Sequence, residues 1–226
     1  MKADPVDAPR ILVLASGAGT NLQALIDASQ ERDFPGKIVA VGCNRPNAFA
    51  LERAAQANIE HFTVDHTRYD TREEFDGMLM AEIRRRNPDL ILLAGFMRIL
   101  TTDFVRALRG TLLNVHPSLL PRYTGLNTHQ RALDAGDTVH GTSIHFVTEQ
   151  LDGGPVIAQA QVQIAWDDTA ETLAEKVQAK EHLLYPIVVK WFCEGRIQLG
   201  TDQVIFDGQP LEQPMVLPDE PATAGG

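Results

Sequence analysis

Three side chains within one stretch of the sequence, Asn114, His116 and Asp152, could together stabilise an oxyanion and move a proton. An asparagine amide can donate to a developing oxyanion, a histidine can transfer a proton, and a carboxylate can hold that histidine in place. Asn114 and His116 lie two residues apart at the end of a short apolar run, so a strand there points both to one side. Pro117 cannot continue a central strand, which must end there. Two glycines follow Asp152 and allow the tight turn that suits a carboxylate placed in a site.

A second candidate site is the glycine-rich segment at 16–21, which reads SGAGTN. It follows an apolar run at 11–15 and precedes a segment with helical spacing at 22–30. A strand, a glycine-rich turn and a helix together present free backbone N–H groups and the positive end of a helix, which bind phosphate. Gly17 and Gly19 would leave room for that phosphate. An ordinary strand-to-helix turn is the alternative, because the segment has neither the Walker spacing nor the full G-x-G-x-x-G pattern.

The order of apolar runs and helical patterns predicts the scaffold that positions these groups. Strands are expected at 11–15, 37–43, 59–64, 89–94 and 112–116, with helices at 22–30, 46–57, 71–86 and 101–108. Later strands at 141–147 and 156–164 are joined by a short turn, and a helix at 169–193 and a hairpin at 196–206 follow. We therefore expect an α/β fold of one domain, an open, mostly parallel, twisted, Rossmann-like sheet with helices on both faces and an antiparallel C-terminal portion. The loop at 44–46 leaves a strand and is expected to face the site.

Composition and the chain ends narrow the class of protein. We expect one domain over residues 10–208, a flexible leader at 1–9 and a disordered tail at 209–226. The net charge of −10 argues against nucleic-acid and basic membrane-surface binding, although backbone amides can still bind a local anion. Without a signal peptide or a bilayer-length apolar run, a cytoplasmic protein is expected. Cys43 and Cys193 form neither a disulfide framework nor a zinc site, and we expect no metal.

Four strings in this sequence resemble the phosphoribosylglycinamide formyltransferases, the folate-dependent enzymes of purine synthesis: ASGAGTNLQALID, AGFMRIL, LLNVHPSLLPRYTG and HGTSIHFVTEQLDGGPVI. The resemblance extends from about Ile11 to Gly208. It implies the formyltransferase fold, with 10-formyltetrahydrofolate as co-substrate and glycinamide ribonucleotide as the acceptor of the formyl group. The family's catalytic asparagine, histidine and aspartate fall on Asn114, His116 and Asp152.

The resemblance also implies two sets of binding residues. The ribotide set combines the glycine-rich loop with a helical segment: Gly19, Thr20, Asn21, Gln178, Ala179, Lys180 and Glu181. The folate set is Arg72, Met97, Arg98, Ile99, Leu100, Asn114, Thr148, Glu149, Gln150, Leu151 and Asp152. Arg72 is implied to lie by the anionic end of the folate, and Glu181 to accept a hydrogen bond from the substrate amine. From the residues alone, the helical segment would be interpreted as a solvated charge run.

Three positions depart from the family's commoner residues. Ala18 stands in place of Asn, and Thr124 and Asn127 stand in place of Pro and His. A backbone-mediated phosphate site tolerates Ala18, and none of the changes removes a triad residue. His129 and His145 are the rival histidines. For His129 a place near substrate and a surface place both stay open, while the strand pattern around His145 favours a structural role.

Other functions share the same core. A hydrolase that releases formate from 10-formyltetrahydrofolate carries a regulatory domain before it, and methionyl-tRNA formyltransferase carries a basic domain after it. We expect neither, because the core begins near Ile11 and the chain ends soon after Gly208. A non-catalytic folate- or phosphate-binding module is a third alternative, which the intact triad disfavours. The expected partners are small-molecule substrates, with no nucleic acid and no membrane, and both a monomer and a homodimer stay open.

Overall fold

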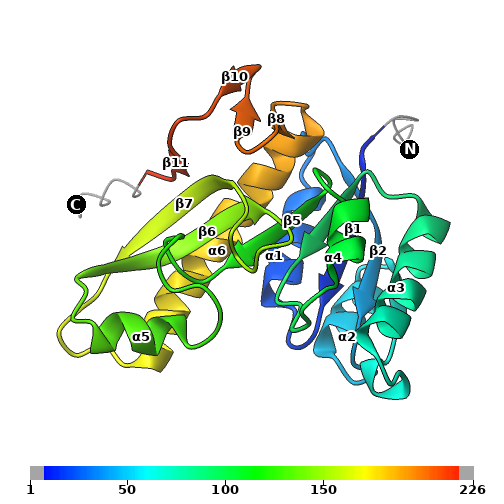
Figure 1. The fold of residues 1–226 in the computed structure, drawn as a ribbon, viewed down its shortest axis with the longest axis horizontal. Helices are drawn as coiled ribbons and strands as arrows, with labels where there is room; N and C mark the ends of the chain where they lie inside the picture. Colours follow the sequence, from blue (N-terminus) through cyan, green and yellow to red (C-terminus); the bar gives the residue numbers. More distant parts are fainter. Residues whose placement is uncertain (1–7, 219–226) are drawn as a thin grey trace.

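A twisted eight-stranded sheet forms the centre of the structure, a computed structural model that describes residues 8–218 (Figure 1). Its strand order is β11-β7-β6-β5-β4-β1-β2-β3. Five strands run parallel: β1 (Arg10–Ala15), β2 (Lys37–Cys43), β3 (Glu60–Thr63), β4 (Leu90–Leu93) and β5 (Leu112–His116). β6 (Val139–Phe146) pairs antiparallel with both β5 and β7 (Val156–Gln163). The expected α/β fold with a mostly parallel sheet and an antiparallel later portion is confirmed.

Helices cover both faces of the sheet. α1 (Thr20–Ser29), α2 (Phe49–Gln56) and α6 (Ala170–Cys193) pack on one face, and α3 (Arg72–Arg86) and α4 (Thr102–Ala107) pack on the other. Alternate side chains of β1 point to opposite faces of the sheet. Ile11 and Val13 pack in the core beneath α1, α2 and α6, and Leu12 and Leu14 pack in the core beneath α3 and α4. α5 (Thr128–Asp134) and a 3-10 turn, η1 (His66–Arg68), complete the helices. No helix within residues 8–218 is long and apolar enough to cross a bilayer.

Two expected helix starts have different outcomes. The capping box of Thr71 and Glu74 opens α3 as predicted, because the Thr71 side chain accepts from the Glu74 N–H. α2, in contrast, begins at Phe49 and not at Pro46. A turn precedes it, in which the Ala48 N–H donates to the Arg45 carbonyl at 3.3 Å. The proline therefore belongs to the loop after β2.

The segment after α6 forms more structure than the sequence predicts. The expected hairpin is confirmed as β8 (Ile197–Leu199) and β9 (Val204–Phe206), to which β10 (Gln209–Pro210) adds. The prediction of a disordered tail is wrong for residues 209–218, because β11 (Met215–Val216) pairs in parallel with β7. A two-residue strand is too short to show an alternating pattern, and its pairing depends on the exposed edge of β7. Residues 219–226 of the expected tail and 1–7 of the expected leader lie outside the described residues.

The loops after β1, β4 and β5 all leave the sheet at the carboxyl ends of its parallel strands. β1 pairs with β2 on one side and β4 on the other, so the direction of the chain through the sheet reverses at β1. Open α/β sheets bind ligands beyond the carboxyl ends of their strands at such a point. α6 is fixed against the same strands by Tyr185, whose buried hydroxyl lies 3.2 Å from the carbonyl oxygens of Leu93 and Leu113. The loops after β1, β4 and β5 therefore share one surface with α6.

Candidate active site

The predicted triad converges at the end of β5. Asn114 and His116 lie there, and Asp152 comes from the loop between β6 and β7. The Nδ1 atom of His116 is 3.5 Å from the Oδ2 atom of Asp152, and both side chains are less than 10% exposed. The same Oδ2 accepts the backbone N–H of Gly125 at 2.8 Å. The carboxylate is thus held on one side by a loop and faces the histidine on the other.

The backbone around Asp152 explains the second of the two glycines after it. Asp152 has a φ of 51°, in the left-handed region that aspartate tolerates better than most side chains. A Cβ atom at Gly154 would lie 1.8 Å from the Phe146 carbonyl oxygen. Only glycine permits this approach, which folds the loop back onto the end of β6.

His145 positions the side-chain amide of Asn114, a contact that the sequence did not reveal. Burial lowers the pKa of His145 to about 4, so the ring is neutral. Its Nδ1 atom is 2.9 Å from the Phe146 carbonyl oxygen, which can only accept, and therefore carries the proton. The Nε2 atom then accepts from the Asn114 amide at 3.1 Å. This fixes the orientation of the amide and leaves its second N–H for a substrate.

The loop at 117–127 covers the other nitrogen of His116. The Nε2 atom donates to the Tyr123 carbonyl oxygen at 2.9 Å. Tyr123 has a φ of 55°, and the side chain of Ser118 donates to the Arg122 carbonyl within the same loop. Sequence reasoning missed this contact, because no local pattern indicates which loop carbonyl reaches the histidine.

The glycine-rich loop after β1, named here the cradle, turns its carbonyl oxygens toward the neighbouring helices. Its three successive carbonyl oxygens are all engaged: Gly17 accepts from the Ala50 N–H at 3.1 Å, Ala18 from the Arg53 Nε–H at 2.8 Å, and Gly19 from the Gln23 N–H at 2.9 Å. With the carbonyls turned to the helices, the amide groups are left for a ligand.

The N-terminus of α1 also has backbone N–H groups that no side chain caps. Gly19 is its N-cap, with a φ of 70°, no capping side chain and no acidic residue in the first turn. A Cβ atom at Gly19 would lie 2.8 Å from the Ala50 Cβ atom, so α2 packs against the loop where only glycine fits. The positive end of the helix is therefore free to bind an anion.

A cavity of about 370 Å³ opens over this loop. Five of the predicted ribotide residues line it: Gly19, Thr20, Asn21, Gln178 and Glu181. Ala179 and Lys180, from the same segment of α6, are not among its lining residues. His129 and Met97 line it too, so His129 faces a cavity, and Met97, expected in the folate set, lines this cavity and not the smaller one described below.

Glu181 carries the acidic charge of the cavity. Its Oε2 atom accepts from the Asn21 amide at 2.7 Å, while the Asn21 Oδ1 atom is buried without a partner. Burial raises the pKa of Glu181. A buried carboxylate and a free amide oxygen are both acceptors, which suits a ligand that brings N–H or O–H donors.

A smaller cavity of about 140 Å³ lies on the Asn114 side of β5. Apolar side chains from β4 and α4 form its floor, and nine predicted folate residues line it: Arg98, Ile99, Leu100, Asn114, Thr148, Glu149, Gln150, Leu151 and Asp152. Such a narrow, largely apolar space with a few polar groups suits a flat ring system. Arg72 does not line this cavity.

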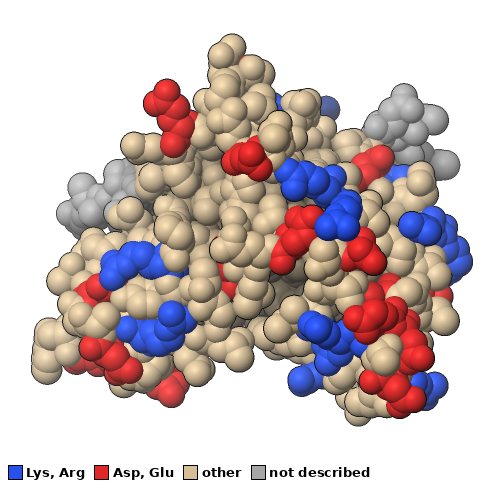
Figure 2. Space-filling view, viewed as in Figure 1, with Lys and Arg blue, Asp and Glu red and all other residues tan. Residues whose placement is uncertain are grey.

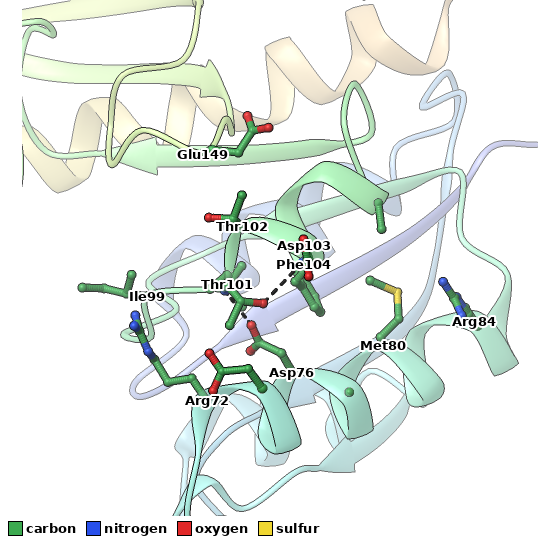
Figure 3. Close-up of a pocket in the computed structure, with 14 residues that line it drawn as sticks. Arg72, Asp76, Met80, Arg84, Ile99, Thr101, Thr102, Asp103, Phe104 and Glu149 are labelled. Carbon is green, nitrogen blue, oxygen red and sulfur yellow. Dashed lines mark hydrogen bonds between the residues drawn. The ribbon is translucent and has the colours of Figure 1, made fainter.

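Arg72 instead lines a groove of about 590 Å³ between α3 and α4, which shares Ile99, Leu100 and Glu149 with the smaller cavity. Figure 3 shows Arg72 at one end of α3 and Arg84 toward the other. Between them, Asp76 accepts the Thr101 N–H at 2.6 Å, and this bond fixes the start of α4. The groove is thus a continuation of the smaller cavity, with a cation near its beginning.

On the face drawn in Figure 2, charged side chains of both signs occur. Figure 2 shows lysine and arginine side chains interspersed with aspartate and glutamate over the visible face. Within residues 8–218, no group of three or more His, Cys, Asp or Glu side chains is placed to hold a metal ion.

Buried histidines make the protein sensitive to mild acid. Burial lowers the pKa values of His140 and His145 to about 4, whereas an unfolded histidine titrates near 6.5. Between these values the unfolded chain binds more protons, so the free energy of unfolding falls as pH falls. From pH 7 to pH 5 we expect a loss of about 2 kcal/mol for each histidine, measured by urea unfolding.

The matched control is a His140→Gln protein, which should lose one histidine's share of this pH dependence. The raised pKa of Glu181 acts in the opposite sense in both proteins and cancels in the comparison. Equal losses in the two proteins between pH 7 and pH 5 would contradict the assignment.

Comparison with known proteins agrees with this fold and site. A family model described as formyl transferase matches residues 9–189 and defines the class of enzyme. The phosphoribosylglycinamide formyltransferase of Escherichia coli (strain K12) is 49% identical over 201 residues, which are 89% of this chain and 95% of that protein. The structure of the enzyme of that name from Coxiella burnetii superposes with a TM-score of 0.89 at 47% identity, covering 94% of this chain and all of that one. The chain belongs to the phosphoribosylglycinamide formyltransferases, enzymes of purine biosynthesis.

Proposed function

We propose that the protein transfers the formyl group of 10-formyltetrahydrofolate to the amine of glycinamide ribonucleotide. The products are formylglycinamide ribonucleotide and tetrahydrofolate. The observation that carries the proposal is the meeting of two cavities at the end of β5: Val115 and Pro117 line the larger one, and Asn114 lines the smaller one. An acceptor in the first and a donor in the second would meet at the triad.

The linings of the two cavities support one arrangement of the substrates. The anion cradle before α1 would bind the phosphate of the ribotide, and Glu181 would accept a hydrogen bond from its amine. The pterin ring would occupy the smaller cavity, with its tail leaving past Ile99 toward Arg72. This orientation places the formyl group beside Asn114 and the amine on the other side of the strand end.

The proposed chemistry is direct acyl transfer. The amine nitrogen attacks the formyl carbon, and a new C–N bond forms as the carbonyl oxygen becomes an oxyanion. The free N–H of Asn114 stabilises that oxyanion, and the Nε2–H of His116 joins it once it leaves the Tyr123 carbonyl oxygen. His116, held by Asp152, takes part in moving one proton from the attacking amine to the departing N10 atom of the folate, whose bond to the formyl carbon breaks. No covalent enzyme intermediate is required.

One reaction run twice tests this function. The protein is incubated with 10-formyltetrahydrofolate, with and without glycinamide ribonucleotide, and tetrahydrofolate and free formate are both measured. We expect tetrahydrofolate only with the ribotide and no formate, because the amine is the acceptor. Formate released at one rate in both reactions would instead establish a hydrolase.

A further inference from the structure

The phosphate cradle contributes backbone dipoles, but a bound phosphate carries nearly two negative charges. Among the residues that line the larger cavity, one lysine or arginine occurs, Arg45, opposite the single carboxylate of Glu181. Arg45 belongs to the 44–46 loop after β2, which the sequence placed at the site's edge of the sheet. It is therefore the one side chain of this lining that carries a permanent positive charge.

Arg45 lies along two sides of the glycine-rich loop. Ser16, Gly17, Ala18 and Arg45 line the cavity of about 370 Å³ over the loop, and the same four residues form part of the lining of a neighbouring cavity of about 450 Å³. No hydrogen bond or ion pair of the Arg45 side chain occurs among the described residues. Its neighbour Arg53, in contrast, is occupied with the Ala18 carbonyl and the Gln23 side chain.

The backbone of Arg45 is held in place by its neighbours. The preceding residue, Asn44, is buried and accepts from the Ser16 hydroxyl at 2.6 Å. The Arg45 carbonyl closes the turn to Ala48, and Pro46 fixes the next backbone angle. The guanidinium thus extends from a fixed base beside the cradle, which reduces the entropy that is lost when it binds a ligand.

We propose that Arg45 binds the phosphate of the acceptor and sets the preference of the enzyme for a phosphorylated over an unphosphorylated acceptor. The proposal rests on the function proposed above. A guanidinium is well suited to this role, because it can make two parallel charge-assisted hydrogen bonds to phosphate oxygens.

The test compares wild type with Arg45→Gln, Arg45→Lys and Arg32→Gln. Arg32 is the matched control: it is exposed, has no hydrogen bond or ion pair among the described residues, and follows the far end of α1, about 15 Å from the cradle. Each protein is assayed with glycinamide ribonucleotide and with the corresponding ribonucleoside. We expect Arg45→Gln to raise the ribotide KM about 10- to 100-fold and to leave the ribonucleoside reaction unchanged. The ribotide KM of Arg45→Lys should lie between those of wild type and Arg45→Gln, and the ribotide KM of Arg32→Gln should match that of wild type.

A second readout does not depend on catalysis. Binding of ribose 5-phosphate, measured by calorimetry, should weaken in Arg45→Gln by the same factor as the KM rises. An Arg45→Gln protein that keeps the wild-type preference for the phosphorylated acceptor and the wild-type affinity for ribose 5-phosphate would overturn the proposal. Failure of the proposed function is distinct, because wild type and Arg32→Gln would then transfer no formyl group to the ribotide at all.

Discussion

Replacing His116 with alanine is expected to lower kcat by about 100- to 10,000-fold, the range of general acid–base catalysis. The ribotide KM should change little, because His116 lies at the end of β5 and not on the phosphate cradle. Steady-state kinetics at saturating concentrations of both substrates measures this split. The control is His61→Ala, an exposed histidine on the edge strand β3. A His116→Ala protein with full activity would refute its catalytic role.

Asn114→Ala belongs to the same experiment and should cost about 100- to 1,000-fold in kcat, as the loss of one oxyanion donor does. The substitution also leaves the Nε2 atom of His145 without its donor. Because His145 is buried, some loss of stability is expected in addition, and thermal unfolding separates that loss from the kinetic effect.

Gly19→Ala is expected to raise the ribotide KM on the order of 100-fold, since several charge-assisted bonds to the phosphate would be misplaced. An alanine at a φ of 70° costs about 1–2 kcal/mol, and its Cβ atom would lie 2.9 Å from the backbone Cα atom of Ala50. The loop must then move away from α2. The folate KM should be little affected, because Gly19 lines only the larger of the two substrate cavities.

Gly136→Ala controls for the backbone penalty alone. Gly136 has a φ of 68° in the turn after α5, with nothing within 4 Å of an added Cβ atom. Both variants should lose a similar amount of stability on account of the positive φ, but only Gly19→Ala should lose affinity for the ribotide. Equal KM values in the two variants would show that the loop geometry is not what binds the phosphate.

The parts of the site that the sequence predicted depend on short-range patterns. Asn114 and His116 share a strand, so their common direction follows from the two-residue repeat. The cradle follows from a strand, two glycines and a helix in succession. The parallel sheet follows from alternating strands and helices, each long enough to show its own periodicity.

The parts that the sequence missed are contacts between distant segments. The strand pattern around His145 predicts only a structural role. Nothing in that pattern indicates that Asn114 lies opposite His145 across the β5–β6 pair. The Arg53 contact to Ala18 joins α2 to a loop 35 residues earlier, and it became visible only with the packing of α2. Ala179 and Lys180 share a helix with Gln178 and Glu181, but the helical rotation turns them away from the cavity.

The short strand β11 has a consequence for solubility. β7 would otherwise end the sheet with a row of unpaired N–H and C=O groups, which is a template for pairing between chains. Met215 and Val216 occupy part of that edge, and the Leu217 N–H donates to the Gln159 carbonyl at 2.9 Å. At the opposite edge, the four-residue β3 begins with Glu60, which pairs with Arg85 and Arg86. A chain shortened before Met215 would keep Asn114, His116, Asp152 and the lining of both cavities, and we expect it to aggregate more readily because the edge of β7 would be exposed.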